Sequence, residues 1–199
     1  MGKASIERPW MKYYKEFNGD LSSTKQTLYR YLRQATYKYT NFTALNYFGK
    51  KYTYFEMIGK IDHLADSYTN LGVKKGDHVV FVTANLPETI YSFYALNKIG
   101  AIPVLVEPRM AKSRIENFIE MVHAKVIVMI DLVWPKIYDL FEKHNIEHVL
   151  VQNASYSLHR YQKFFMKIFG KKTKIEYSDI VMSFHDFSKK YVPHCAVEA

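Results

Sequence analysis

Four short apolar runs recur along residues 77–151 at nearly equal intervals. They begin near residues 77, 102, 125 and 147, so successive starts lie 25, 23 and 22 residues apart. Val, Ile, Leu, Met and Phe dominate each run without polar alternation, which is typical of strands buried on both faces. Strand–helix–strand crossovers place such strands parallel in one sheet. The spacing therefore predicts an α/β fold with layered helices around a mainly parallel sheet.

The bounds of these repeated units follow from the same pattern. We expect strands at 77–83, 102–106, 125–130 and 147–151, with helices at 87–98, 112–122 and 134–144 between them. One sheet covered on both faces should bury a set of valines, namely Val80, Val82, Val104, Val106, Val128 and Val149.

The segment before the repeats predicts a helical lead-in and a hairpin. Residues 1–40 are rich in helix signals, with Leu28, Tyr31, Leu32 and Ala35 at helical spacing. Residues 42–48 are strand-like, and Gly49, Lys50 and Lys51 predict a turn into a second strand at 52–53. A short β-hairpin is therefore expected near 42–53.

A helix is predicted over 54–71. Thr53 and Glu56 form the pattern of a capping box, in which each side chain accepts a hydrogen bond from the other residue's backbone amide. Gly72 supplies a stop signal. The expected apolar face comprises Phe55, Ile58, Leu64, Ala65, Tyr68 and Leu71.

Residues 153–199 differ in character from the repeats. Between Arg160 and Lys174 there are six Lys or Arg and no acid, and apolar residues in 158–169 fall largely on one helical face. We favour a surface helix whose apolar face packs on the sheet, and the alternative is weak contact with an anionic membrane or another polyanion. Residues 175–187 predict a short strand and one or two helical turns, and 191–199 predict no element. The expected division is thus 1–40, 41–152 and 153–199.

Charge and cysteine content restrict the environment and the partners. The chain has 28 Lys and Arg against 19 Asp and Glu, a net charge of +9. The single cysteine, Cys195, excludes an internal disulfide and fits a reducing cytoplasm. No secretory signal or apolar run long enough for a transmembrane segment is present. No recognisable reading motif accompanies the positive charge, so no specific nucleic-acid partner is expected.

Phosphate-loop and phosphoacceptor chemistry fit the sequence poorly. Between Gly72 and Gly76 lie three residues where a P-loop needs four, and Asp77 follows where it needs Lys. This turn is better explained as a helix-to-strand connection. Asp131 follows a strand, as a phosphoacceptor would, but the acidic pair that such a site needs after the first strand is missing. Asp131 is therefore expected to cap a helix.

No metal site is expected either. His144 and His148 are four residues apart, but Asn145 and Ile146 interrupt the helix between them, so the two imidazoles should not share a face. The remaining candidates, His185, His194 and Cys195, would meet only through tertiary contacts.

Two motifs resemble those of the AMP-forming adenylating superfamily, which includes acyl-CoA synthetases, luciferases and adenylation domains. The string TYFEM at 53–57 is similar to its opening core motif, carried by Thr53, Tyr54 and Glu56, with Met57 in place of Leu. The string ALNKIGAIPVLVEP at 95–108 is similar to the next motif. There the matching positions are Lys98, Gly100, Ala101 and Pro108. The resemblance covers roughly residues 25–152.

The resemblance implies an N-terminal part of an acyl-CoA synthetase fold and a structural role for these motif residues. The intact enzyme would join a carboxylic acid to CoA with ATP and Mg²⁺. The family's phosphate-binding loop, adenine site and C-terminal domain with the adenylation lysine have no counterpart in these 199 residues.

No catalytic residue, no metal ligand and no tight ATP or CoA binding is therefore expected here. We expect an inactive N-terminal fragment, whose partner would be the remainder of the synthetase. The alternative is a stand-alone basic α/β module for an anionic partner.

Overall fold

A five-stranded parallel sheet forms the centre of the structure. The computed structural model describes residues 26–153, 155, 158 and 173–190. The strand order is β4-β3-β5-β6-β7, and every neighbouring pair is parallel. The strands are β3 (His78–Val82), β4 (Ile102–Val106), β5 (Val126–Ile130), β6 (His148–Gln152) and β7 (Val181–Ser183). The predicted parallel α/β fold is confirmed.

The strand order corrects one expectation about burial. β4 lies at the edge of the sheet, so it is not buried on both faces: Leu105 is 60% exposed and Val104 is only half-buried. Pro103 lies inside this strand. An edge strand tolerates proline because one side of its backbone has no ladder to join. The other valines predicted to be buried are buried.

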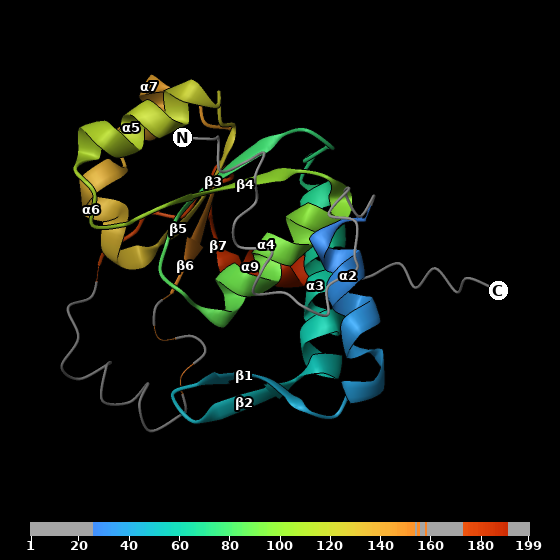
Figure 1. Cartoon of the computed structure of the whole chain (residues 1–199). Helices are drawn as coiled ribbons and strands as arrows, with labels where there is room; N and C mark the ends of the chain where they lie inside the picture. Colours follow the sequence, from blue (N-terminus) through green and yellow to red (C-terminus); the bar gives the residue numbers. More distant parts are fainter. Residues whose placement is uncertain (1–25, 154, 156–157, 159–172, 191–199) are drawn as a thin grey trace, which may run out of the picture.

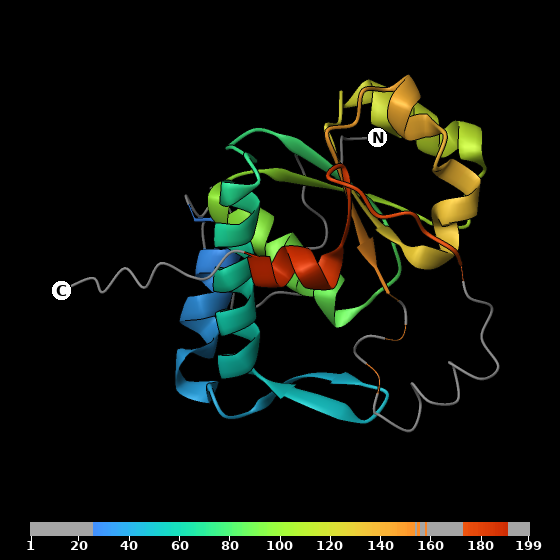
Figure 2. The same ribbon diagram turned by 180° about the vertical axis from the view of Figure 1, so that it is seen from behind.

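Helices cover both faces of the sheet (Figures 1 and 2). On one face lie α2, α3, α4 and α9. The opposite face carries the helices that follow β4 and β5. Their bounds are α2 (Leu28–Thr36), α3 (Tyr54–Asn70), α4 (Pro87–Ile99), α5 (Lys112–Met121), α6 (Trp134–Ile137), α7 (Leu140–Lys143) and α9 (Phe184–Lys190).

Alternate residues of the same strands form two separate cores. Val79 and Phe81 of β3 face α3, α4 and α9. Their neighbours Val80 and Val82 face α5, α6 and α7. Successive side chains of a strand point to opposite faces, so an unbroken apolar strand serves both layers at once. This explains why the strands at 77–151 show no polar alternation.

The predicted hairpin is present, with its turn displaced by one residue. β1 (Thr43–Tyr47) pairs antiparallel with β2 (Lys50–Thr53). Phe48 and Gly49 form the turn, with φ values of 48° and 86°. Two consecutive positive φ values suit the right-handed twist of a two-residue hairpin. The turn therefore ends at Gly49, and Lys50 and Lys51 belong to β2.

Helix α3 begins at the predicted capping box, and its buried face departs from the predicted one at Phe55. The side chain of Thr53 accepts from the Glu56 amide at 3.2 Å, and Glu56 Oε2 accepts from the Thr53 amide at 2.8 Å. Phe55 is 72% exposed, contrary to expectation. Met57 and Ile61 are buried beside the predicted Leu64, Ala65 and Tyr68.

Helix α2 also turns a different face inward from the predicted one. Leu28 and Tyr31 are exposed, whereas Tyr29 and Thr36 are buried. The Tyr29 amide donates to Asn97 Oδ1 at 2.8 Å, and this bond ties the start of α2 to the end of α4. A short 3₁₀ turn, η2 (Tyr37–Tyr39), continues the chain toward the hairpin.

The predicted helix over 134–144 is broken. A 3₁₀ turn, η3 (Asp131–Val133), precedes α6, and Tyr138 and Asp139 separate α6 from α7. The Asp139 carboxylate pairs with the Lys112 ammonium of α5. Asp131 lies within the first turn of η3, whose N-cap is Ile130, so Asp131 is not the cap.

The last described elements agree with the sequence. β7 extends the parallel sheet beside β6, and α9 packs under α3, where Phe187 contacts Tyr68 with ring centroids 5.0 Å apart. The predicted basic helix at 158–169 and the tail at 191–199 lie outside the described residues, apart from buried Leu158.

Candidate functional site

The carboxyl ends of the strands place polar groups at one edge of the sheet. β4 lies on one side of β3, whereas β5 and the later strands lie on its other side. The strand order therefore reverses between β3 and β5. Doubly wound sheets bind ligands at this reversal, outside the carboxyl ends of the strands. Here Thr83 follows β3, Asp131 follows β5 and Gln152 ends β6.

A cluster of half-buried Thr83 with buried Thr89 and Gln152 occupies this edge. Gln152 Oε1 accepts from Thr83 Oγ1 at 2.6 Å and lies 3.0 Å from Thr89 Oγ1. The Thr89 hydroxyl also lies 3.0 Å from the carbonyl of Ala84, so one proton is shared between two acceptors. The cluster holds the start of α4 against the ends of β3 and β6.

The Gln152 carboxamide keeps one donor group unused. Its side chain is 1% exposed, and Nε2 has no hydrogen-bond partner among the described residues. Leaving a buried donor unsatisfied costs roughly 1–3 kcal/mol. Gln152 was missed by sequence reasoning, although a lone polar residue that ends an apolar strand was a usable signal.

The first motif lies away from this edge, at the start of α3. Thr53 and Glu56 join β2 to α3 through the capping box. The Thr53 amide and then its hydroxyl donate to the Glu56 carboxylate, which lowers the pKa of Glu56. Tyr54 is half-buried and packs against the core beneath α3.

The second motif ends helix α4 and leads into β4. Gly100 adopts φ 79°, the left-handed C-cap conformation, and Ala101 is buried. Lys98 Nζ contacts Asp62 Oδ1 of α3 at 2.7 Å. The carbonyl of Pro108 accepts from Lys136 Nζ at 2.9 Å, which joins the end of this motif to α6.

The turn with superficial likeness to a phosphate loop is a helix-to-strand connection. Gly72 and Gly76 have φ values of 99° and 88°, and Asp77 Oδ2 accepts from the Lys74 amide at 2.8 Å. The turn borders a cavity of about 410 Å³ at the amino ends of the strands. It therefore lies at the opposite edge from the carboxyl ends.

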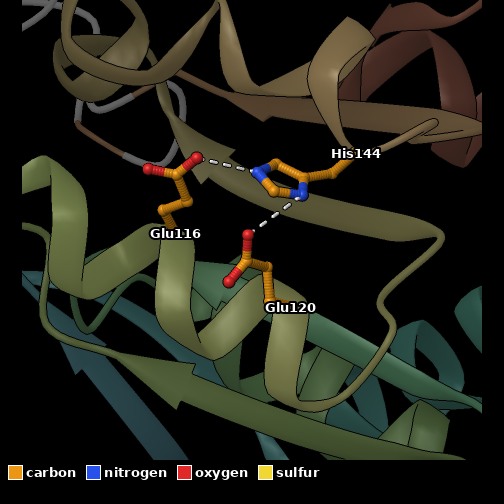
Figure 3. Close-up of side chains that lie close together, drawn as sticks. All are labelled: Glu116, Glu120 and His144. Atoms are coloured by element: carbon orange, nitrogen blue, oxygen red, sulfur yellow. Dashed lines mark hydrogen bonds and ion pairs between the residues drawn. The ribbon is translucent and has the colours of Figure 1, made fainter.

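One side-chain cluster among the described residues has the composition of a metal site (Figure 3). Glu116 and Glu120, one turn apart on α5, face His144 at the end of α7. His144 Nε2 lies 2.9 Å from Glu116 Oε1, and Nδ1 lies 3.8 Å from Glu120 Oε1. His144 does not meet His148, as expected, but its carboxylate partners were missed because they lie 24–28 residues earlier in the chain.

One carboxylate of this cluster, Glu116, already has an ammonium partner within the chain. Lys143 Nζ lies 2.5 Å from Glu116 Oε1. The Lys143 ammonium first, and then His144, lower the pKa of Glu116. A divalent cation would have to displace this ammonium. The arrangement therefore acts as an ion-pair network that fastens α7 to α5.

Comparison with known proteins places the chain in a family. The model of the AMP-binding enzyme family matches residues 32–173. The chain belongs to this family. The matched residues correspond to the N-terminal part of a protein of this superfamily, whose members include acyl- and aryl-CoA ligases. They include both motif strings.

Individual relatives are ligases of several acids. A long-chain-fatty-acid–CoA ligase of Bacillus subtilis is 25% identical over 149 residues, which cover 74% of this chain and 27% of that protein. A vibriobactin-specific 2,3-dihydroxybenzoate-AMP ligase of Vibrio cholerae is 32% identical over 104 residues. These cover 52% of this chain and 19% of that protein.

Solved structures share the fold. The anthranilate CoA ligase AuaEII gives a TM-score of 0.67 at 19% identity, covering 83% of this chain and 28% of that one. A long-chain-fatty-acid-CoA ligase from Archaeoglobus fulgidus gives 0.60 at 24% identity, covering 66% and 28%. The chain thus spans no more than about 28% of any of these four proteins. Among the described residues, no helix has the length and apolar character needed to cross a membrane.

Proposed function

We propose that this chain forms the N-terminal part of an AMP-forming acyl-CoA synthetase that acts on a fatty acid in the cytoplasm. The family match over residues 32–173 carries the proposal. The fatty acid is supported by the Bacillus subtilis relative, whose alignment covers 74% of this chain. The proposed division into a helical lead-in (1–40), an α/β core (41–152) and a basic tail (153–199) belongs to the same interpretation.

The proposed reaction has two steps. A carboxylate oxygen of the acid attacks the α-phosphorus of ATP, and the bond to the pyrophosphate leaving group breaks. The CoA thiolate then attacks the carbonyl carbon of the acyl-adenylate and expels AMP. Magnesium bound to the phosphates would neutralise part of their charge in the first step.

Neither the Gly72–Gly76 turn nor the acidic cluster around Glu116 is built to hold Mg²⁺ with the phosphates that the ligation reaction transfers. The Gly72–Gly76 turn uses Asp77 to bond its own backbone, and Lys143 already neutralises Glu116 in the acidic cluster. The motif residues Thr53, Tyr54, Glu56, Lys98, Gly100, Ala101 and Pro108 are proposed to be structural. The carboxylic acid, ATP and CoA are then handled jointly with the remainder of the synthetase.

We therefore propose that the 199-residue chain alone is not an active ligase. Stabilising charge on the transferring phosphoryl group requires convergent, positioned donors, and orientation supplies much of the rate. Scattered lysines attract polyanions without aligning them. Weak, salt-sensitive contact of residues 160–174 with an anionic surface is part of this proposal.

Exchange of labelled pyrophosphate into ATP tests these proposals. The gene is read beyond the codon for Ala199, and both the 199-residue chain and any in-frame extension are assayed with fatty and aromatic acids. We expect exchange with long-chain fatty acids from the extended protein only. Exchange above a no-enzyme blank from a preparation whose mass ends at Ala199 would contradict inactivity. Exchange with aromatic acids alone would contradict the fatty-acid substrate.

A second candidate function rests on the net charge of +9. A stand-alone basic module would bind an anionic partner without turnover. A stop codon directly after Ala199, with no phosphate loop in frame, would favour this candidate over the ligase.

A further inference from the structure

Three cationic side chains surround one hollow between α2 and the end of α4. The hollow has a volume of about 800 Å³. Among the described residues, its lining includes Arg30, Arg33 and Lys98 together with Tyr29, Gln34 and Tyr37, and no carboxylate. Ligand sites commonly measure about 300–1,000 Å³, so the hollow is large enough for a nucleotide-sized molecule.

The sequence of α2 places these groups on one side of the helix. Arg30, Arg33, Gln34 and Tyr37 stand at positions i, i+3, i+4 and i+7, which share a helix face. Tyr37 keeps right-handed helical angles, φ −53° and ψ −40°, so the stripe continues past the last helical residue. It is 79% exposed. The stripe therefore combines two guanidinium groups with one aromatic ring open to solvent.

A buried hub orients two of the three cations. The Tyr29 hydroxyl donates to Asp62 Oδ1, and the same oxygen accepts from Lys98 Nζ at 2.7 Å. Arg33 Nη1 donates to the Tyr29 hydroxyl at 3.3 Å. Burial first, and then Asp62, raise the pKa of Tyr29 to about 12, so the phenol stays neutral. Arg33 and Lys98 are thus held in place before any ligand arrives.

The hollow is lined by one cation, Arg30, whose charge no described carboxylate balances. Asp62 is the carboxylate next to it and pairs with Lys98, and no described carboxylate forms an ion pair with Arg30. Arg30 lies in the first turn of α2, which holds no acid, where the helix dipole disfavours a cation. Arg30 and Arg33 also repel each other at i, i+3 spacing. An anionic ligand would relieve both penalties.

We propose that this hollow binds a nucleoside phosphate, with the two arginines and Lys98 on the phosphates and Tyr37 stacked on the base. Arginine forks match phosphate oxygens in pairs, and aromatic rings stack on any base. The backbone amides at the start of α2 are already engaged by Thr27 and Asn97, so the side chains make the site. This binding requires neither the acid substrate nor turnover, so it stands independently of the proposed ligase activity.

Calorimetric titration of the 199-residue chain with ATP and with inorganic pyrophosphate tests the site. In R30Q/R33Q we expect both affinities to fall about tenfold or more, because charge-assisted hydrogen bonds are lost. Y37S should weaken ATP but leave pyrophosphate unchanged. R30K/R33K keeps the charge without the fork and should give an intermediate loss.

Two controls separate the hollow from general attraction to a basic protein. K51Q/K74Q removes the same charge from exposed positions elsewhere, and K171Q/K172Q removes it from the basic segment. We expect each to change the ATP affinity by less than about twofold at physiological ionic strength, since exposed charges are screened there. Thermal unfolding of each variant confirms that it is folded.

Several results would overturn the proposal. These are no ATP binding by the unaltered chain, equal losses in R30Q/R33Q and the controls, or a loss confined to K171Q/K172Q. Binding to phosphatidylserine-containing vesicles that depends on Arg30 and Arg33, without binding of ATP, would replace the nucleotide with a lipid surface.

Discussion

The Glu56 carboxylate shows how one side chain fixes the junction between the hairpin and α3. It accepts from the Thr53 amide, while the Thr53 hydroxyl accepts from the Glu56 amide. Each group satisfies a donor that the first turn of a helix leaves without an intrahelical partner. Thr53 and Glu56 therefore set where α3 begins.

Removing either half of the capping box should lower stability in a distinguishable way. Thr53→Ala should cost about 1 kcal/mol of unfolding free energy. Glu56→Gln keeps an acceptor but removes the charge. Because the folded-state pKa of Glu56 is lowered, its ionic contribution is complete above the unfolded-state pKa and disappears as the pH falls through the folded-state value. The deficit of Glu56→Gln should therefore be largest at neutral pH and narrow in acid.

Urea melts at several pH values measure this difference. Glu176→Gln is the matched control, since it removes the same charge at an exposed position outside any helix. A deficit in Glu56→Gln that widens on acidification would contradict the prediction.

Replacing Gly59 or Gly100 by alanine should change the stability of the chain in opposite directions. Gly59 lies inside α3, and a Cβ added there would have no neighbouring atom within 4 Å, so Gly59→Ala should stabilise the chain by about 0.5–1 kcal/mol. Gly100 adopts φ 79°, and an added Cβ would meet Lys75 Cγ at 2.9 Å. Gly100→Ala should therefore destabilise by about 1 kcal/mol or more. Equal effects of the two changes in thermal melts would contradict this.

At the scale of elements, α3 packs chiefly on α4 within the helical layer that covers one face of the sheet. Its buried positions follow a spacing of about 3.6 residues per turn from Met57 through Ile61, Leu64 and Tyr68. Phe55 lies on the other side of the helix and is exposed. The rest of the predicted face is confirmed, because Ile58 and Leu71 also pack against this core.

Core truncation distinguishes the two faces of α3. Leu64 is 3% exposed, so Leu64→Ala should cost about 2–5 kcal/mol through lost burial and the cavity left behind. Phe55→Ala should change stability by no more than about 0.5 kcal/mol, as exposed substitutions usually do. Denaturant melts of both variants provide the measurement. A neutral Leu64→Ala would show that this face is not the core.

Sequence patterns within a few residues predicted most helices and strands, whereas they could not predict the contacts between these elements. The capping box, the glycine stop and the apolar strands are encoded within a few residues, and the structure confirms them. The edge position of β4 depends on the strand order, which the apolar run at 102–106 does not carry. The break after α6 falls at Asp139, whose carboxylate pairs with Lys112 on another helix.

At the scale of the whole molecule, the distance along the chain between the residues of a site explains which sites the sequence could predict. Thr83 and Gln152 are 69 residues apart, and Tyr29 and Lys98 are also 69 residues apart. Only the parallel sheet and the packing of α2 on α4 bring them together. The family motifs were visible because each is a continuous string.

The two cores should lose their structure together, because every central strand belongs to both. Leu64 lies in the core on the α3 side, and Trp134 packs against the core on the other side of the sheet. If β3, β5 and β6 cannot stay folded once one helical layer has unfolded, a substitution that destabilises one face must also lower the unfolding free energy measured from the other face. Leu64→Ala should therefore shift the Trp134 fluorescence transition by the same amount as the far-ultraviolet circular dichroism transition. The parent chain and both variants would carry Trp10→Phe, so that Trp134 is the single tryptophan that reports unfolding. Phe55→Ala should shift neither transition. A Trp134 transition unmoved by Leu64→Ala would mean that the two layers unfold independently.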